Sequence, residues 1–101
     1  MSNWPFVDPP NVAVFTCKAI ISGDDWIHYV SHDDDDGAWQ FQPPGGPTSE
    51  QDAAIVGLGT LFRIDPSIGE LHDLPLGWCA WRQAKDAKWQ RMKKHGSGSE
   101  Q

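Results

Sequence analysis

The sequence is organised around residues 26–42, which read Trp-Ile-His-Tyr-Val-Ser-His-Asp-Asp-Asp-Asp-Gly-Ala-Trp-Gln-Phe-Gln. Two aromatic-rich arms flank a polar centre that ends in Asp36-Gly37. Asp-Gly is a strong turn signal, because glycine adopts a positive φ without strain and aspartate tolerates it. The stretch therefore predicts a β-hairpin.

The second arm of this hairpin alternates in polarity. Trp39 and Phe41 are separated by Gln40 and followed by Gln42. Successive side chains of a strand point to opposite faces, so the two aromatic rings share one face. We expect Trp39 and Phe41 to be buried together with Phe15 of an earlier strand, and the two glutamines to be more exposed.

The composition predicts one globular domain, residues 1–93, followed by a flexible tail, residues 94–101. The chain has 101 residues, of which 39% are apolar and 11% aromatic. A domain of this length buries enough surface to fold without disulfides. Cys17 and Cys79, the two cysteines, are expected to be reduced, and the absence of a long apolar run predicts no membrane span and a cytoplasmic protein.

The net charge of −6 is unevenly placed along the chain. Residues 1–52 carry nine acidic side chains and one basic one, whereas residues 53–101 carry five acidic and seven basic ones. Acidic surfaces repel phosphate backbones, so nucleic acid is an unfavourable partner. A basic protein is the partner that this charge fits better.

Before the hairpin, the apolar odd positions of residues 12–21 predict a strand with Phe15 and Cys17 facing inward. After it, Ser49 as a helix cap predicts one or two helical turns over residues 49–54. Residues 55–64 fit both a helix and a strand. The glycines at 57 and 59 each cost a helix about 1 kcal/mol, which favours the strand.

Three further elements follow. Asp65-Pro66 predicts a short helical turn over residues 66–71, with Asp65 as its cap. Residues 78–82 predict a strand with Trp78 and Trp81 on opposite faces, and residues 88–92 predict a last strand, for which a helix over 83–93 is the alternative. The expected fold class is α+β, a mainly antiparallel sheet of about five strands with one or two short helices.

Metal-binding patterns fail in this sequence. Placing Gly37 at the sixth position of a calcium loop puts His32 and Pro43 where oxygen ligands are needed. His28 and His32, four residues apart on a strand, lie about 13 Å apart, too far for one zinc ion. We expect no metal, no cofactor and no structural calcium at Asp33–Asp36.

No catalytic motif stands out, so we expect a protein that is not an enzyme. The residues that chemistry favours for contact with a partner are the acidic turn and two tryptophans: Asp33, Asp34, Asp35, Asp36, Trp78 and Trp81. Charged side chains accelerate association with an oppositely charged protein, and tryptophans are common binding anchors.

Several segments resemble the bacterial immunity-protein-33-like family. They are Asp8-Pro9-Pro10-Asn11, Val30-Ser31-His32-Asp33, Asp36-Gly37-Ala38-Trp39-Gln40-Phe41, Asp65-Pro66-Ser67 with Glu70-Leu71, and Asp73-Leu74-Pro75-Leu76-Gly77-Trp78 with Ala80-Trp81-Arg82. The resemblance spans about residues 4–90. It implies a non-enzymatic protein that neutralises a toxin by binding it, and it supplies no catalytic residues. The alternative is a small-ligand-binding or regulatory domain that uses a tryptophan-lined face.

Overall fold

The computed structural model describes residues 4–45 and 49–94. Along the chain the elements are β1 (Ala13–Cys17), α1 (Lys18–Ser22), β2 (Tyr29–His32), β3 (Trp39–Gln42), β4 (Ala53–Gly57), α2 (Leu58–Ile64), the 3₁₀ helix η1 (Pro66–Leu71), β5 (Trp78–Trp81) and β6 (Gln90–Lys93). The chain thus has the expected α+β character in its described part.

The strands form one six-stranded sheet in the order β4-β1-β3-β2-β5-β6. Adjacent strands are antiparallel except β1 and β3, which run parallel. The expected sheet of about five mainly antiparallel strands is therefore a mixed sheet of six, and three helical segments replace the expected one or two in the described residues. β1 and β3 are joined through β2, so their parallel pairing does not follow from any one hairpin.

The predicted hairpin is confirmed. β2 pairs with β3 in the register Val30 to Phe41 and His32 to Trp39. Gly37 has a φ of 74°, which only glycine adopts without strain, and its amide donates to the carbonyl of Asp33. Trp39 and Phe41 are buried while Gln40 is partly exposed, as the alternation predicted.

The predicted inward position of Phe15 is wrong. Phe15 is 43% exposed, and the buried residues of β1 are Val14, Thr16 and Cys17. The odd-position pattern of residues 12–21 misled because its last members, Ala19 and Ile21, belong to α1 and not to the strand. Over the true strand both faces carry apolar side chains, so periodicity alone does not set the register.

Residues 49–64 also differ from expectation. Residues 50–52 form a turn that leads into β4, in place of the predicted helical turns over 49–54. The favoured strand over 55–64 ends at Gly57, and α2 follows. The glycine at 59 serves close packing: a Cβ there would lie 3.1 Å from Cβ of Pro10, and its amide donates to the carbonyl of Pro10. Its low helix propensity is offset by that contact.

The later elements agree with the sequence more closely. The carboxylate of Asp65 accepts from the backbone amide of Ser67 at the start of η1. β5 and β6 pair as antiparallel strands, so the predicted last strand is confirmed and the alternative helix over residues 83–93 is not formed. Lys94, placed in the predicted tail, donates its amide to Gly77; residues 95–101 of that tail lie outside the described residues.

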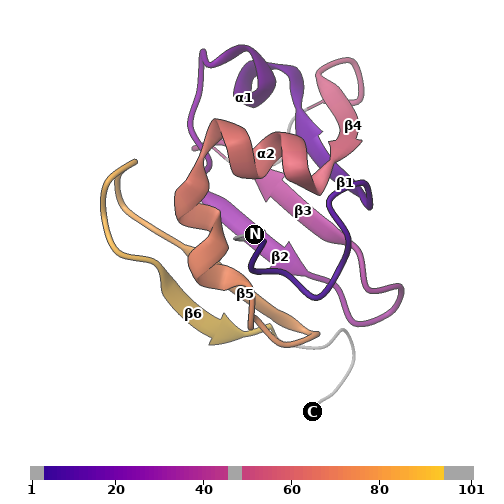
Figure 1. The fold of residues 1–101 in the computed structure, drawn as a ribbon. Coiled ribbons are helices and arrows are strands. Elements are labelled where there is room, and N and C mark those ends of the chain that lie inside the picture. Colours follow the sequence, from indigo (N-terminus) through magenta and orange to yellow (C-terminus); the bar gives the residue numbers. More distant parts are fainter. Residues whose placement is uncertain (1–3, 46–48, 95–101) are drawn as a thin grey trace.

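Figure 1 shows α2 and η1 lying across one face of the sheet, with the N-terminal arm on the same side. The core fills the space between them. Phe6 of the arm is buried against Trp39 and Phe62, with ring centroids 5.5 and 6.4 Å away in edge-to-face geometry. Ile20 of α1, Leu58 and Leu61 of α2 and Ile68 of η1 join the same core. We call this side the covered face.

Two phenylalanines test this one-sided arrangement. Phe41→Ala should lower the free energy of unfolding by about 3–5 kcal/mol, because it leaves a cavity in a packed core. Phe15→Ala, in the neighbouring region but on the other face, should cost only about 1 kcal/mol, because much of its ring already contacts water. Urea denaturation of both variants measures the difference. Equal losses would contradict the assigned faces.

Candidate functional site

The face of the sheet opposite the helices carries a row of side chains that crosses all six strands. Strand pairing places them in register, from β4 to β6: Ile55, Phe15, Gln40, Ser31, Cys79 and Met92. A second row beside it contains Gln42, Tyr29, Trp81 and Gln90. Paired residues of neighbouring strands point to the same side, so both rows share one surface. We call it the open face.

Large apolar side chains on the open face contact water. Ile55 is 63%, Phe15 43% and Met92 42% exposed. Trp81 and Tyr29 are half-buried on the same face. No helix of the described residues covers them in Figure 1. Ile55 and Phe15 are neighbours at the β4 end, whereas Met92 lies at the β6 end beyond Gln40 and the buried Ser31 and Cys79. Exposed large apolar side chains on a sheet face are common at binding sites.

The open face is hollowed beside Phe15. A depression of about 370 Å³ is lined by Phe15, Gln40, Gln42, Pro43 and Asp36, among others. Its lining combines two phenylalanines, Phe15 and the buried Phe41, with two amide side chains and a carboxylate. Such a lining suits an inserted side chain that has both an apolar stem and a polar or cationic end.

A polar network occupies the end of the open face near the hairpin turn. The carboxylate of Asp33 accepts from Nζ of Lys94 at 2.9 Å and from Nε2 of Gln40 at 2.6 Å. Partial burial alone would raise the pKa of Asp33, but the hydrogen bonds from Lys94 and Gln40 and the Lys94 charge hold that pKa below its ordinary value. Asp33 is therefore a positioned anion that fixes β6 to the turn.

The remaining acids of the turn face solvent. Asp34, Asp35 and Asp36 are exposed, and a carboxylate oxygen of Asp36 accepts from the amide of Ala38 at 3.0 Å. Carboxylate oxygens of Asp33, Asp35 and Asp36 can lie within 4.8 Å of one another. Because Lys94 and Gln40 already engage Asp33, this cluster has the character of an acidic surface turn. Asp34, Asp35 and Asp36 carry its exposed negative charge.

The two tryptophans predicted as partner contacts lie on opposite faces, as expected. Trp78 is paired with His32 on the covered face and packs against the core. Trp81 is paired with Tyr29 on the open face. Burial, with a smaller effect of the neighbouring Cys79 thiol, raises the pKa of Tyr29 to about 12. The structure brings Trp81 near the open-face rows and leaves Trp78 apart from them.

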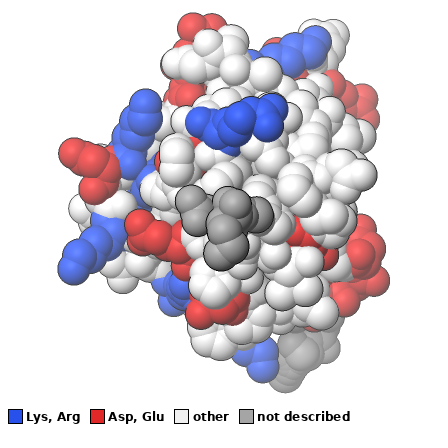
Figure 2. All heavy atoms as spheres, viewed as in Figure 1, with Lys and Arg blue, Asp and Glu red and all other residues white. Residues whose placement is uncertain are grey.

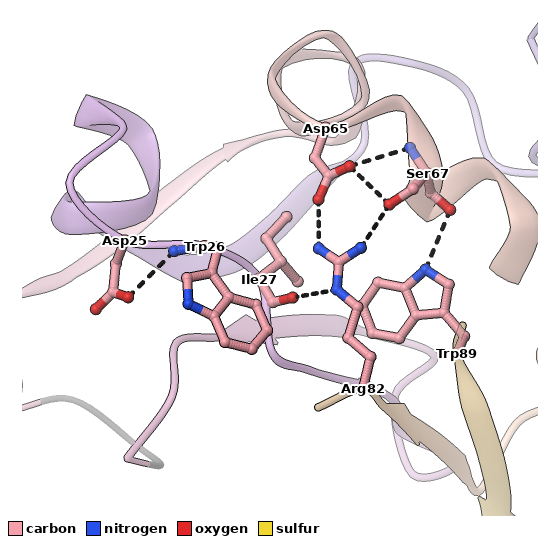
Figure 3. A network of polar contacts seen from close by, with 7 residues as sticks. All are labelled: Asp25, Trp26, Ile27, Asp65, Ser67, Arg82 and Trp89. Atoms are coloured by element: carbon pink, nitrogen blue, oxygen red, sulfur yellow. Dashed lines mark hydrogen bonds and ion pairs between the residues drawn. The ribbon is translucent and has the colours of Figure 1, made fainter. Parts of the chain in front are cut away.

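A second polar cluster surrounds Arg82, which is only 1% exposed (Figure 3). Its guanidinium donates to the carboxylate of Asp65 and to Oγ of Ser67, and its Nε donates to the carbonyl of Ile27 at 2.9 Å. The guanidinium also lies 4.2 Å from the ring centroid of Trp89. These contacts satisfy the buried charge and join η1 to β5, so the cluster holds the covered face together.

Partial burial would raise the pKa of Asp65, but hydrogen bonds from Ser67 and Arg82 hold it below the ordinary value. The carboxylate therefore stays ionised in the folded chain. Sequence reasoning missed Arg82, because an arginine at the end of a strand is usually exposed. The Asp-Pro-Ser segment at the start of η1 was the one sequence feature that pointed to Asp65, the partner of Arg82.

A smaller feature lies near the arm. A depression of about 350 Å³ is lined by Val7, His32, Trp39 and Leu76, among others. His32 stacks on Trp39 with ring centroids 3.9 Å apart, and its Nδ1 lies 2.8 Å from the carbonyl of Leu74. The stacked pair is thus held by the loop that precedes β5. We assign it a structural role beside the core.

Charges of both signs are spread over the molecule, in unequal proportions. In Figure 2, Lys and Arg side chains lie mainly toward the left with acidic side chains among them, and the right margin is mostly acidic. Lys85, Lys88, Arg91 and Lys93 are exposed on β6 and in the segment before it. Arg91 pairs with the exposed Asp73. The hairpin end therefore attracts cationic surfaces more than the β6 end does.

Comparison with known proteins found no match among family models, curated proteins or solved structures. Within residues 4–45 and 49–94, no helix is long and apolar enough to cross a membrane. The resemblance to the immunity-protein-33-like family remains a prediction from the sequence. The functional assignment below is therefore argued from the surface itself.

Asp65→Asn tests the Arg82 cluster. Removing one partner of a buried ion pair leaves an unpaired charge, so the free energy of unfolding at neutral pH should fall by about 3 kcal/mol. The folded pKa of Asp65 is lowered, so its contribution is present above the unfolded pKa near ~4 and lost as pH falls below it. Urea denaturation at pH 7 and at acidic pH should show a flatter pH dependence for the variant.

Asp73→Asn, in an exposed ion pair, is the control and should change the free energy of unfolding little. A loss as small as the control's would contradict the assigned role.

Proposed function

We propose that this chain is a non-enzymatic binding protein whose docking surface is the open face, bordered by the acidic turn Asp33–Asp36. The observation that carries the proposal is the six-residue row from Ile55 to Met92, in which apolar side chains remain exposed on an otherwise well-packed sheet. A protein partner that covers this row would bury its apolar surface, which is the main favourable term in protein association.

The partner proposed is a basic protein. Lys94 is engaged by Asp33, whereas Asp34 and Asp35 present negative charge to solvent at one end of the surface. Asp36 also lines the hollow beside Phe15, where a lysine or arginine side chain could place its apolar stem against the ring and its charge against the carboxylate. Shape and charge therefore favour a cationic side chain at this position.

Together with the sequence resemblance, this surface supports an immunity role. A protein of that kind acts by covering a toxin, and needs a rigid surface of complementary charge more than it needs catalytic groups. The alternative of a small-ligand domain called for a deep aromatic pocket with convergent polar groups. The hollow on the open face is open to solvent, and of the two phenylalanines that line it only Phe15 is exposed, so it fits a side chain of a protein partner better.

The electrostatic part of the proposal is tested by Asp34→Asn combined with Asp35→Asn. The association rate with a basic partner should fall at low salt and lose most of its salt dependence, because exposed charges steer encounter more than they hold the complex. The partner to use is the recombinant product of a toxin gene beside the gene for this chain. Surface plasmon resonance at low and high salt measures the rates. Unchanged rates at both salt concentrations would refute the steering role.

The apolar part is tested by Phe15→Ser and Trp81→Ser on the open face. Each should weaken binding at least tenfold, mainly through faster dissociation, because aromatic anchors dominate binding energy. Val7→Ser is the matched control, since Val7 is 97% exposed but belongs to the arm on the covered side. If the control weakens binding as much as the open-face variants, the docking surface is elsewhere. If the toxin is not bound by the wild-type chain at all, the immunity role fails.

A further inference from the structure

The two edges of the sheet differ in composition. β6, at one edge, has the sequence Gln-Arg-Met-Lys, and charged side chains on an edge strand oppose pairing with another chain. β4, at the other edge, is Ala-Ala-Ile-Val-Gly and carries neither a charge nor a proline. Figure 1 shows β4 at the end of the sheet, with β1 as its neighbour. The β4 edge is therefore the one open to strand addition.

Pairing with β1 determines which groups of β4 point outward. The amide of Leu58 donates to Val12 and the amide of Lys18 donates to Asp52, which fixes these two pairs as hydrogen-bonded. Hydrogen-bonded pairs alternate along an antiparallel ladder, so residues 54 and 56 also bond to β1. The backbone groups of Ala53, Ile55 and Gly57 consequently point away from the sheet.

Two of those outward groups already have partners. The amide of Ala53 donates to the carbonyl of Glu50 at 3.3 Å. The carbonyl of Gly57, the N-cap of α2, accepts the first hydrogen bond of that helix. Within residues 4–45 and 49–94, the outward groups without a hydrogen-bond partner are the amide and carbonyl of Ile55, the amide of Gly57 and the carbonyl of Ala53. This set contains two donors and two acceptors.

We propose that two copies of this chain associate through antiparallel pairing of their β4 strands, with Ile55 on the two-fold axis. In that register the Ile55 residues exchange both hydrogen bonds, and each Gly57 amide reaches the Ala53 carbonyl of the other copy. In this register, the Ala53 amide of one copy lies opposite the Gly57 carbonyl of the other, and both of these groups already have partners within their own chain. Every free group of β4 therefore finds a partner in the other copy.

Charge and symmetry agree with this arrangement. The nearest acid on the chain, Asp52, faces position 58 of the other copy, so the two Asp52 carboxylates lie about 20 Å apart along the strand direction. A two-fold pairing uses the β4 edge of both copies and leaves the charged β6 edges outermost, so assembly stops at the dimer. The open faces lie side by side and stay accessible, so this inference does not depend on the proposed function.

The register is tested by disulfide cross-linking. Hydrogen-bonded antiparallel partners have Cα atoms about 5.5 Å apart, within the range that a disulfide spans. Ile55→Cys should therefore form a covalent dimer on mild oxidation, seen on a non-reducing gel. Ala53→Cys is the matched control, because both residues are exposed but the two copies of position 53 lie about 13 Å apart. The natural cysteines, Cys17 and Cys79, are buried.

The mass in solution completes the test. Light scattering of the wild-type chain should approach twice 11.2 kDa as concentration rises from about 10 μM to about 1 mM, and Ile55→Lys should remain at 11.2 kDa because two like charges meet at the axis. A wild-type mass that stays at 11.2 kDa, or a dimer that Ile55→Lys leaves intact, would overturn the proposal. Equal cross-linking at positions 53 and 55 would overturn the register.

Discussion

A sheet covered on one face only is the constraint on which this structure depends. The arm, α1, α2 and η1 all contribute to the core on the covered face, and every second residue of each strand then lies on the other side. Antiparallel sheets tolerate water on one face when that face is polar. Here the open face mixes glutamines and a serine with phenylalanine, isoleucine, tryptophan and methionine. That mixture gives it the composition of a binding surface.

The covered side is made rigid by two kinds of contact. Backbone close approach joins the arm to α2, where Gly59 lies against Pro10. The Arg82 cluster joins η1 to β5 and to the carbonyl of Ile27. Both contacts link segments that are distant in the sequence, so the open face is carried on a well-supported layer. A rigid surface loses little conformational entropy on binding, which favours affinity.

The sequence predicted the parts of the fold that local chemistry determines. The Asp36-Gly37 turn, the alternation of Trp39 and Phe41, the Asp65 cap and the opposite faces of Trp78 and Trp81 follow from residues near one another. The errors arose where distant contacts decide. Phe15 faces out because the register of β1 places it beside Gln40 of β3 and Ile55 of β4, and Gly59 fits a helix because Pro10 packs on it. Of the site, the acidic turn and Trp81 were identified, whereas the row that joins Phe15 to Met92 depends on strand order.

The strand order also determines where charged residues lie around the open face. The acidic turn follows β2 near the centre of the sheet, and exposed bases lie on β6 and before it. The row from Ile55 to Met92 crosses the sheet beside the turn, so the row gives a partner a surface to bury and the turn gives it a direction of approach. This combination accounts for the proposed preference for a basic protein over a nucleic acid, whose phosphates the exposed turn would repel.

The most direct test of the docking surface is an amide chemical-shift map of the labelled chain during titration with the proposed basic protein partner. The account predicts that the largest changes fall on the central strands and at the turn, at residues such as Phe15, Gln40 and Asp34, while α2 and η1 change little. Changes centred on α2 and η1, with the open-face residues unaffected, would contradict it.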